Sequence, residues 1–143
     1  MIYCTLFDSN YLDKGVVMIE SLNDVDKDAL VYVLCMDDLA NKILHELNIS
    51  CCRIIPLEEF EDEDLLKIKE SRSRGEYCWT CTAKLIKYVI NYYDHEMCTY
   101  VDSDLFFYSN PKVLIDEMVI NNCTVQVIAH NFPNTKNGKK LET

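Results

Sequence analysis

The stretch L-V-Y-V-L-C-M, residues 30–36, decides the fold class of this chain. It is an unbroken apolar run, which is typical of a strand that is covered on both faces. Shorter β-prone runs at residues 2–7, 53–57 and 97–101 are separated from it by segments with apolar residues at helical spacing. Strands that alternate with helices predict a mainly parallel sheet with helices on both faces. The sequence therefore predicts an α/β fold.

Polar residues mark where the helices between these runs should begin. Helix starts are predicted at Asp8-Ser9-Asn10, at Asp37-Asp38 and at Asn110-Pro111, the last opening a helix that ends near Ile120. Residues 61–72 and 80–93 are also predicted to be helical, and residues 124–129 to form a last strand. Residues 134–143 are polar and show no periodicity, so the predicted domain covers residues 1–133 and ends in a polar tail.

Composition and charge exclude several functions. The chain has 24 acidic and 14 basic residues, a net charge of −10, and it therefore lacks the basic footprint of a nucleic-acid-binding protein. No apolar run approaches the roughly 20 residues that span a bilayer, and the N-terminus does not resemble a signal peptide. Most of the eight cysteines lie in apolar runs, as Cys4, Cys35, Cys98 and Cys123 do, which favours buried, reduced thiols. These features predict a cytoplasmic protein.

Asp102-Ser103-Asp104 carries the sharpest chemical signal in the sequence. In extended backbone, residues two apart point to the same side, so both carboxylates can face one hard cation such as Mn²⁺ or Mg²⁺. A solvated acidic turn is the alternative, because such triplets are common. The position directly after a strand favours the metal site, because ligands of parallel sheets bind beyond the carboxyl ends of the strands. Asp8 follows the first predicted strand in the same way.

Other chemistry-bearing residues have a simpler interpretation. Cys78 and Cys81 form a C-x-x-C pair, which can be a redox pair or half of a zinc site. A second zinc pair would have to come from Cys51 and Cys52, whose adjacency suits tetrahedral ligation poorly. Packing cysteines at a helix start are therefore the favoured interpretation. The three histidines show no ligand spacing: His45, His95 and His130.

Three motifs give the chain a family resemblance. They are Y-C-T-L-F-D-S-N-Y at positions 3–11, E-Y-C-W-T-C-T-A-K-L at 76–85 and T-Y-V-D-S-D-L-F at 99–106. In this order and at these separations, the chain resembles the GT-A glycosyltransferases, most closely those of the family 8 type. The resemblance runs to about Pro133. It implies a GT-A fold that binds a nucleotide-diphospho-sugar, commonly UDP-linked, for transfer to a glycan or protein acceptor.

The resemblance also implies roles for particular residues. Asp102 and Asp104 match the D-x-D motif that holds Mn²⁺ against the two phosphates, and Ser103 would lie near the ribose. The remaining matches are Thr5, Leu6 and Phe7 as backbone contacts to the nucleoside; Asp8, Asn10 and Tyr11 as the acid, amide and aromatic that read the base; and Lys84 as a contact to the diphosphate and sugar. From the residues alone, other interpretations are equally open. Asp8 and Asn10 could be helix caps, Tyr11 could be an ordinary surface residue, and Lys84 could be a solvated lysine.

Departures from the family pattern leave alternatives open. Family 8 members carry, further along, a histidine that completes the metal site and a phosphate-binding Gly/Lys motif, and neither has a match here. We therefore expect a truncated chain that binds nucleotide without transferring sugar, with no residue identifiable as its catalytic base or nucleophile. The alternatives are a non-catalytic nucleotide-binding module or remnant and, less favoured, an aspartyl-nucleophile phosphatase. That class has a hydroxyl residue where Phe106 stands. A nicotinamide-binding domain is weaker still, because no G-x-G-x-x-G occurs.

Overall fold

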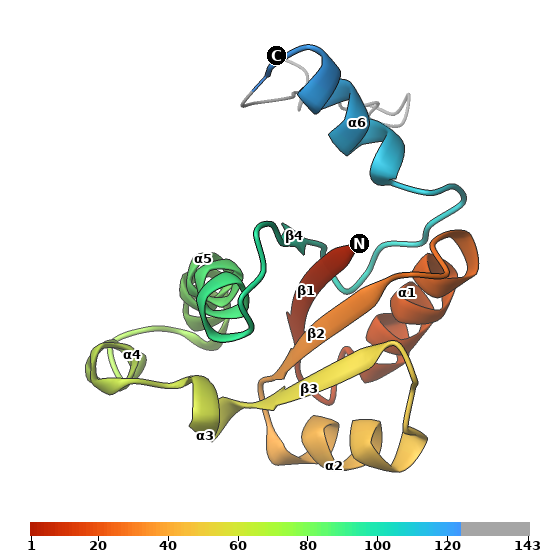
Figure 1. The fold of residues 1–143 in the computed structure, drawn as a ribbon. Coiled ribbons are helices and arrows are strands. Elements are labelled where there is room, and N and C mark those ends of the chain that lie inside the picture. Colours follow the sequence, from red (N-terminus) through yellow and green to blue (C-terminus); the bar gives the residue numbers. More distant parts are fainter. Residues whose placement is uncertain (124–143) are drawn as a thin grey trace, which may run out of the picture. The chain divides into compact units, whose positions relative to one another are not determined.

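The structure is a computed structural model that describes residues 1–123 (Figure 1). The chain divides into one compact unit, Met1–Asn110, and a second unit that begins at Pro111. All of the predicted site residues lie in the first unit. The predicted strand 124–129, the tail 134–143, the boundary at residue 133 and His130 lie outside the described residues.

The first unit is built on a parallel sheet. Its four strands are β1 (Ile2–Phe7), β2 (Leu30–Cys35), β3 (Cys52–Pro56) and β4 (Thr99–Tyr100), in the spatial order β3-β2-β1-β4. Every pair is parallel, with Tyr3 opposite Val31 of β2 and opposite Thr99 of β4. The predicted α/β fold with a mainly parallel sheet is therefore confirmed.

Helices cover both faces of this sheet. The helices are α1 (Leu12–Val25), α2 (Asp38–Leu47), α3 (Leu57–Phe60), α4 (Glu63–Lys69) and α5 (Arg74–Tyr92) in the first unit, and α6 (Lys112–Ile120) in the second. Because successive strand residues point to opposite faces, β1 and β2 feed two separate cores. One core is formed with α1 and α2, and the other with α3, α4 and α5.

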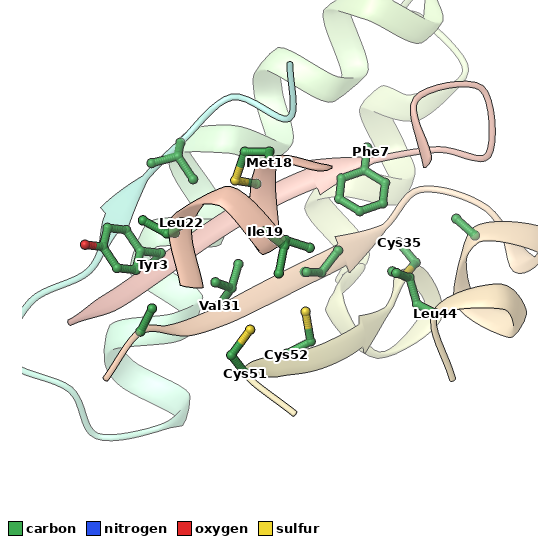
Figure 2. Packing of buried hydrophobic residues seen from close by; sticks show 14 residues of the cluster. Tyr3, Phe7, Met18, Ile19, Leu22, Val31, Cys35, Leu44, Cys51 and Cys52 are labelled. Carbon is green, nitrogen blue, oxygen red and sulfur yellow. The ribbon is translucent and has the colours of Figure 1, made fainter. Parts of the chain in front are cut away.

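The core under α1 and α2 is shown in Figure 2. Met18, Ile19 and Leu22 of α1 pack on Val31 and on other residues of β1 and β2, and all four side chains are fully buried. Close packing of α1 on β1 depends on Gly15, because a Cβ atom there would lie 2.4 Å from the ring of Phe7. On the other face, Tyr77, Cys81, Leu85 and Val89 form the buried stripe of α5. This packing fixes both α1 and α5 at the end of β1.

Helix starts differ from prediction in three places. Helix α5 begins at Arg74, six residues before the predicted start at Thr80, because Ser73 and Glu76 form a capping box there. Helix α1 begins at Leu12 with Tyr11 as its N-cap residue and no side-chain cap, so the capping alternative for Asp8 and Asn10 is wrong. Helix α6 has Pro111 as its N-cap residue, again with no side-chain cap. Only the start at Asp37 is capped as predicted, its carboxylate accepting from the Ala40 amide.

Lengths also differ in the middle of the chain. The predicted charged helix 61–72 is the shorter α4, capped by Asp62, and the short helix α3 precedes it. The strand predicted at residues 97–101 pairs over two residues only. Among residues 1–123, this strand lies at the sheet edge, where a single neighbour supplies its ladder, so the apolar run overstates the paired length.

The predicted burial of the cysteines is confirmed in part. All eight cysteines are free thiols, and five of them are buried: Cys4, Cys35, Cys51, Cys52 and Cys81. Cys98 is half-buried and Cys123 is exposed, so the prediction of burial is wrong for Cys123. Within residues 1–123, no helix combines the length and the apolar character that a membrane crossing requires.

Candidate functional site

The candidate site lies where the strand order of the sheet reverses. The chain runs from β1 outward through β2 to β3, and later returns to place β4 on the other side of β1. The loops that leave β1 and β4 therefore diverge at the carboxyl end of the sheet, and ligands of open α/β sheets bind in such a crevice. A cleft of about 470 Å³ occupies this position. It is lined by Leu6, Phe7, Asp8, Tyr11, Arg74, Gly75, Cys78, Trp79, Thr82, Tyr100, Asp102, Ser103 and Asp104.

The loop after β1 supplies one acidic side chain and one aromatic ring. Asp8 is held by a turn in which its Oδ1 accepts from the Asn10 backbone N–H at 2.9 Å, and its carbonyl accepts from the Tyr11 N–H at 3.0 Å. Tyr11 is exposed, and the Lys14 ammonium lies 4.5 Å from its ring centroid. Asn10 is exposed and holds Asp8 but does not line the cleft. The loop thus presents Asp8 and Tyr11 together.

The segment after β4 supplies the other carboxylates. The Val101 N–H donates to the Cys4 carbonyl at 3.0 Å, which extends the strand pairing up to Asp102. Asp102 and Asp104 are exposed and line the cleft, as does the half-buried Ser103 between them in the sequence. Residues 103 and 104 form a turn, in which the Leu105 N–H donates to the Asp102 carbonyl at 3.4 Å, rather than the predicted extended backbone. Burial raises the pKa of Tyr100 to about 12, and the Asp102 carboxylate beside its hydroxyl adds to the rise. Tyr100 is therefore a neutral neighbour of the carboxylates at physiological pH.

The donor chemistry of this edge suits a hard divalent cation. Asp102 and Asp104 offer carboxylate oxygens, the ligands that Mn²⁺ and Mg²⁺ prefer. No group of three acidic, histidine or cysteine side chains in residues 1–123 is arranged to hold a metal ion. A cation held at Asp102 and Asp104 would therefore complete its coordination with water or with oxygens of a bound phosphate, as Mg²⁺ commonly does.

Arg74 is the site residue that the motifs did not identify. It is the first residue of α5, and its Nη2 forms an ion pair with Asp8 and lies 3.5 Å from Oδ2 of Asp37. Among the described residues that line the cleft, it is the one cation. The signal for it was the sequence S-R-G-E at 73–76, because this capping-box pattern places residue 74 in the first helical turn.

Asp37 ties the ends of β1 and β2 to Arg74. Its carboxylate accepts from the Ser9 amide, from the Ser9 hydroxyl at 2.8 Å and from the Ala40 amide at 2.9 Å. Burial opposes its ionisation, but these hydrogen bonds and the Arg74 guanidinium prevail and lower the pKa of Asp37 below its ordinary value. Arg74 thus joins two carboxyl groups from neighbouring strand ends.

Four predicted residues remain, of which two line the cleft and two do not. Leu6 and Phe7 line the cleft with apolar side chains. Thr5 is fully buried and does not line it, and its Oγ1 has no hydrogen-bond partner among the described residues. Lys84 is not brought to the cleft. It forms an ion pair with Asp62 and lies 5.7 Å from the Phe60 ring centroid, on another face of α5.

Comparison with known proteins gives two curated relatives. The chain is 36% identical over 115 residues to the uncharacterized protein YfnF of Bacillus subtilis (strain 168), and this match covers 80% of the chain and 38% of YfnF. It is 34% identical over 116 residues to the uncharacterized protein YfnD of the same organism, covering 80% of the chain and 37% of YfnD. The chain thus spans less than two fifths of the length of these relatives. No protein-family model matches the chain.

Proposed function

We propose that this chain is the nucleotide-sugar-binding part of a glycosyltransferase of the GT-A type, and that it uses a divalent cation and a UDP-linked donor. The observation that carries the proposal is the convergence of Asp8, Asp102 and Asp104 on one cleft at the switch point of a parallel sheet. These residues come from two motifs that lie far apart in the sequence. A solvated acidic turn would not need a partner motif at the same crevice.

Charge explains why a cation belongs in this proposal. The cleft is lined by three carboxylates, Asp8, Asp102 and Asp104, and among the described residues only Arg74 opposes them. A nucleoside diphosphate is itself an anion and would be repelled by this surface. A cation between the D-x-D carboxylates and the phosphates removes that repulsion. When bound, it would also stabilise the charge on the departing diphosphate.

Different residues of the cleft would contact different parts of the nucleotide-sugar donor. Tyr11 offers an exposed ring on which a base can stack, and Asp8 offers a fixed acceptor for a base N–H. Asp102 and Asp104 would hold the cation, with Ser103 beside the ribose. Leu6 and Phe7 close the cleft below with apolar surface, which excludes water from one side of the bound nucleotide.

Substitution of the two carboxylates tests the proposal. We expect Asp102→Asn/Asp104→Asn to weaken UDP binding in the presence of Mn²⁺ by at least about tenfold, or 1.4 kcal/mol, while the unfolding free energy is retained because both side chains are exposed. Asp24→Asn, an exposed carboxylate on α1 outside the cleft, is the matched control. If the double variant binds UDP as tightly as the control does, the D-x-D carboxylates are not part of the site.

A further inference from the structure

One face of α5 forms a wall of the cleft. Gly75, Cys78, Trp79 and Thr82 all line it, and their spacing of three and four residues places them on one side of the helix. A Cβ atom added to Gly75 would meet no other atom within 4 Å, so the space in front of the first turn is open. The capping box at Ser73 and the buried stripe of α5 hold this wall in place. It is therefore a fixed surface with room for a ligand in front of it.

Trp79 is the unusual residue of this wall. It is the only tryptophan of the chain, and its side chain is 76% exposed. No residue in the described range 1–123 forms a hydrogen bond, ring contact or cation–π contact with its indole. Tyr92 on the same helix is similarly exposed, at 69%, but its ring stacks on Tyr88 with centroids 5.0 Å apart. Trp79 thus lines the cleft with an exposed indole that has no such partner among residues 1–123.

We propose that Trp79 is the stacking platform for a pyranose ring, contributed either by the sugar of the nucleotide donor or by an acceptor glycan. A pyranose has an apolar face of C–H groups, which packs on the large π surface of an indole, and a rim of hydroxyl groups that needs polar partners. Thr82, Ser103 and Asp104 line the same cleft and offer such partners. The proposal rests on the proposed function, because it adds a sugar subsite to the nucleotide site.

The position of Tyr11, the other exposed aromatic residue of the cleft, leaves Trp79 for the sugar. Tyr11 comes from the loop after β1, beside Asp8, where the base is proposed to bind. Trp79 comes from α5, more than one helical turn beyond Arg74, which pairs with Asp8 of that loop. We place the base of the bound nucleotide on Tyr11 and its phosphates opposite Asp102. The sugar of the donor, or an acceptor glycan, would then lie against α5.

Binding of matched nucleotides tests the subsite. UDP, UDP-glucose, UDP-galactose and UDP-N-acetylglucosamine are titrated by calorimetry with Mn²⁺ into the wild type and into Trp79→Ala, Trp79→Phe and Tyr92→Ala. Lactose and maltose are titrated with and without saturating UDP to represent an acceptor. We expect at least one sugar-bearing probe to gain roughly three- to tenfold over UDP, or one disaccharide to bind, in the wild type. This gain should be lost in Trp79→Ala, partly kept in Trp79→Phe and unchanged in Tyr92→Ala.

The single tryptophan supplies a second readout. Because Trp79 is the only indole, its fluorescence should respond to the sugar-bearing probe that binds and should respond equally in Tyr92→Ala. The donor and acceptor sources are separated by which class of probe gives the gain. The proposal is wrong if no sugar-bearing probe exceeds UDP and no disaccharide binds, or if the gain survives in Trp79→Ala. It is also wrong if Trp79→Ala weakens UDP itself as much, because the indole would then stack on the base.

Failure of the proposed function gives a different result. If the wild type does not bind UDP with Mn²⁺, the proposed nucleotide site is wrong. The disaccharide titrations without nucleotide then test the Trp79 subsite by themselves. Disaccharide binding that is lost in Trp79→Ala would support the subsite by itself. No response of Trp79 fluorescence to any disaccharide would overturn it.

Discussion

At the scale of single residues, the ion pair between Arg74 and Asp8 governs the charge of the cleft. Arg74 is 61% exposed, whereas the Asp8 side chain is largely buried, so the arginine can move while the carboxylate stays fixed. Its planar guanidinium can hold two carboxylate groups or a phosphate equally well. The residue is thus placed both to order the loop after β1 and to contact an anionic ligand.

Removal of the Arg74 charge should weaken nucleotide binding. We expect Arg74→Gln to raise the dissociation constant of UDP with Mn²⁺ by about three- to tenfold, because an exposed charge pair contributes on the order of 1 kcal/mol. The dissociation constant of Arg74→Lys should lie between those of the wild type and Arg74→Gln, because lysine keeps the positive charge but lacks the planar guanidinium that binds two oxygens at once. Calorimetry measures both, with the exposed Arg72→Gln as the matched control. Unchanged affinity in Arg74→Gln would show that Arg74 serves neither Asp8 nor the ligand.

The residues of the site were predictable to different degrees. Asp8 follows β1 directly, and Asp102 and Asp104 lie within four residues of the end of β4, so local sequence is enough to place them at the carboxyl end of the sheet. Arg74 and Asp8 meet only because α5 packs against the end of β1, a contact that no local pattern records. Lys84 matches a motif, but the helical phase of α5 turns it toward Asp62, whereas Trp79 faces the cleft.

At the scale of elements, the start of α2 links the loop after β1 to the sheet. Asp37 caps α2 and at the same time accepts two hydrogen bonds from Ser9 in the loop after β1. One carboxylate therefore stabilises a helix terminus, a loop and the position of Arg74. The capping residue of α2 was readable from sequence because Asp37 follows a clear apolar strand. The start of α5 is marked by the capping-box pattern at residues 73–76, but the prediction missed it because a charged segment without apolar contrast precedes it.

The lowered pKa of Asp37 predicts a pH-dependent contribution to stability. A carboxyl whose pKa is lower in the folded state stabilises the fold above its unfolded pKa, ordinarily 3.8, and loses this contribution as the pH falls through the folded pKa. Asp37→Asn keeps a good cap residue but removes the charge. We therefore expect the variant to be less stable than wild type by about 1 kcal/mol at pH 7, with the difference shrinking below pH 3.8. Urea unfolding from pH 7 to pH 2.5 measures this difference.

A neighbouring carboxylate provides the control for this experiment. Asp38→Asn alters an exposed side chain one residue further on, for which no Ser9 or Arg74 contact exists among the described residues. Its effect should depend less on pH than that of Asp37→Asn. A gap between Asp37→Asn and wild type that stays constant across the pH range would contradict the assigned interactions.

At the scale of the whole molecule, the strand order decides what the sequence motifs can do together. Alternating apolar runs were sufficient to predict the parallel sheet, because continuous strands and amphipathic helices leave distinct patterns. The order β3-β2-β1-β4 could not be predicted from the sequence, because nothing in the short β4 segment indicates which strand it pairs with. This order brings the loop after β1 beside the D-x-D segment and so creates the cleft.

The metal dependence of nucleotide binding tests the central claim most directly. The chain carries a net charge of −10, and its cleft holds three carboxylates against one described cation. Calorimetric titration of UDP into the wild-type chain with Mn²⁺, and again with a chelator, isolates the role of the cation. The account predicts measurable binding with Mn²⁺ and affinity lower by at least about tenfold in its absence. Equal affinity for UDP in the chelator, or no binding under either condition, would contradict it.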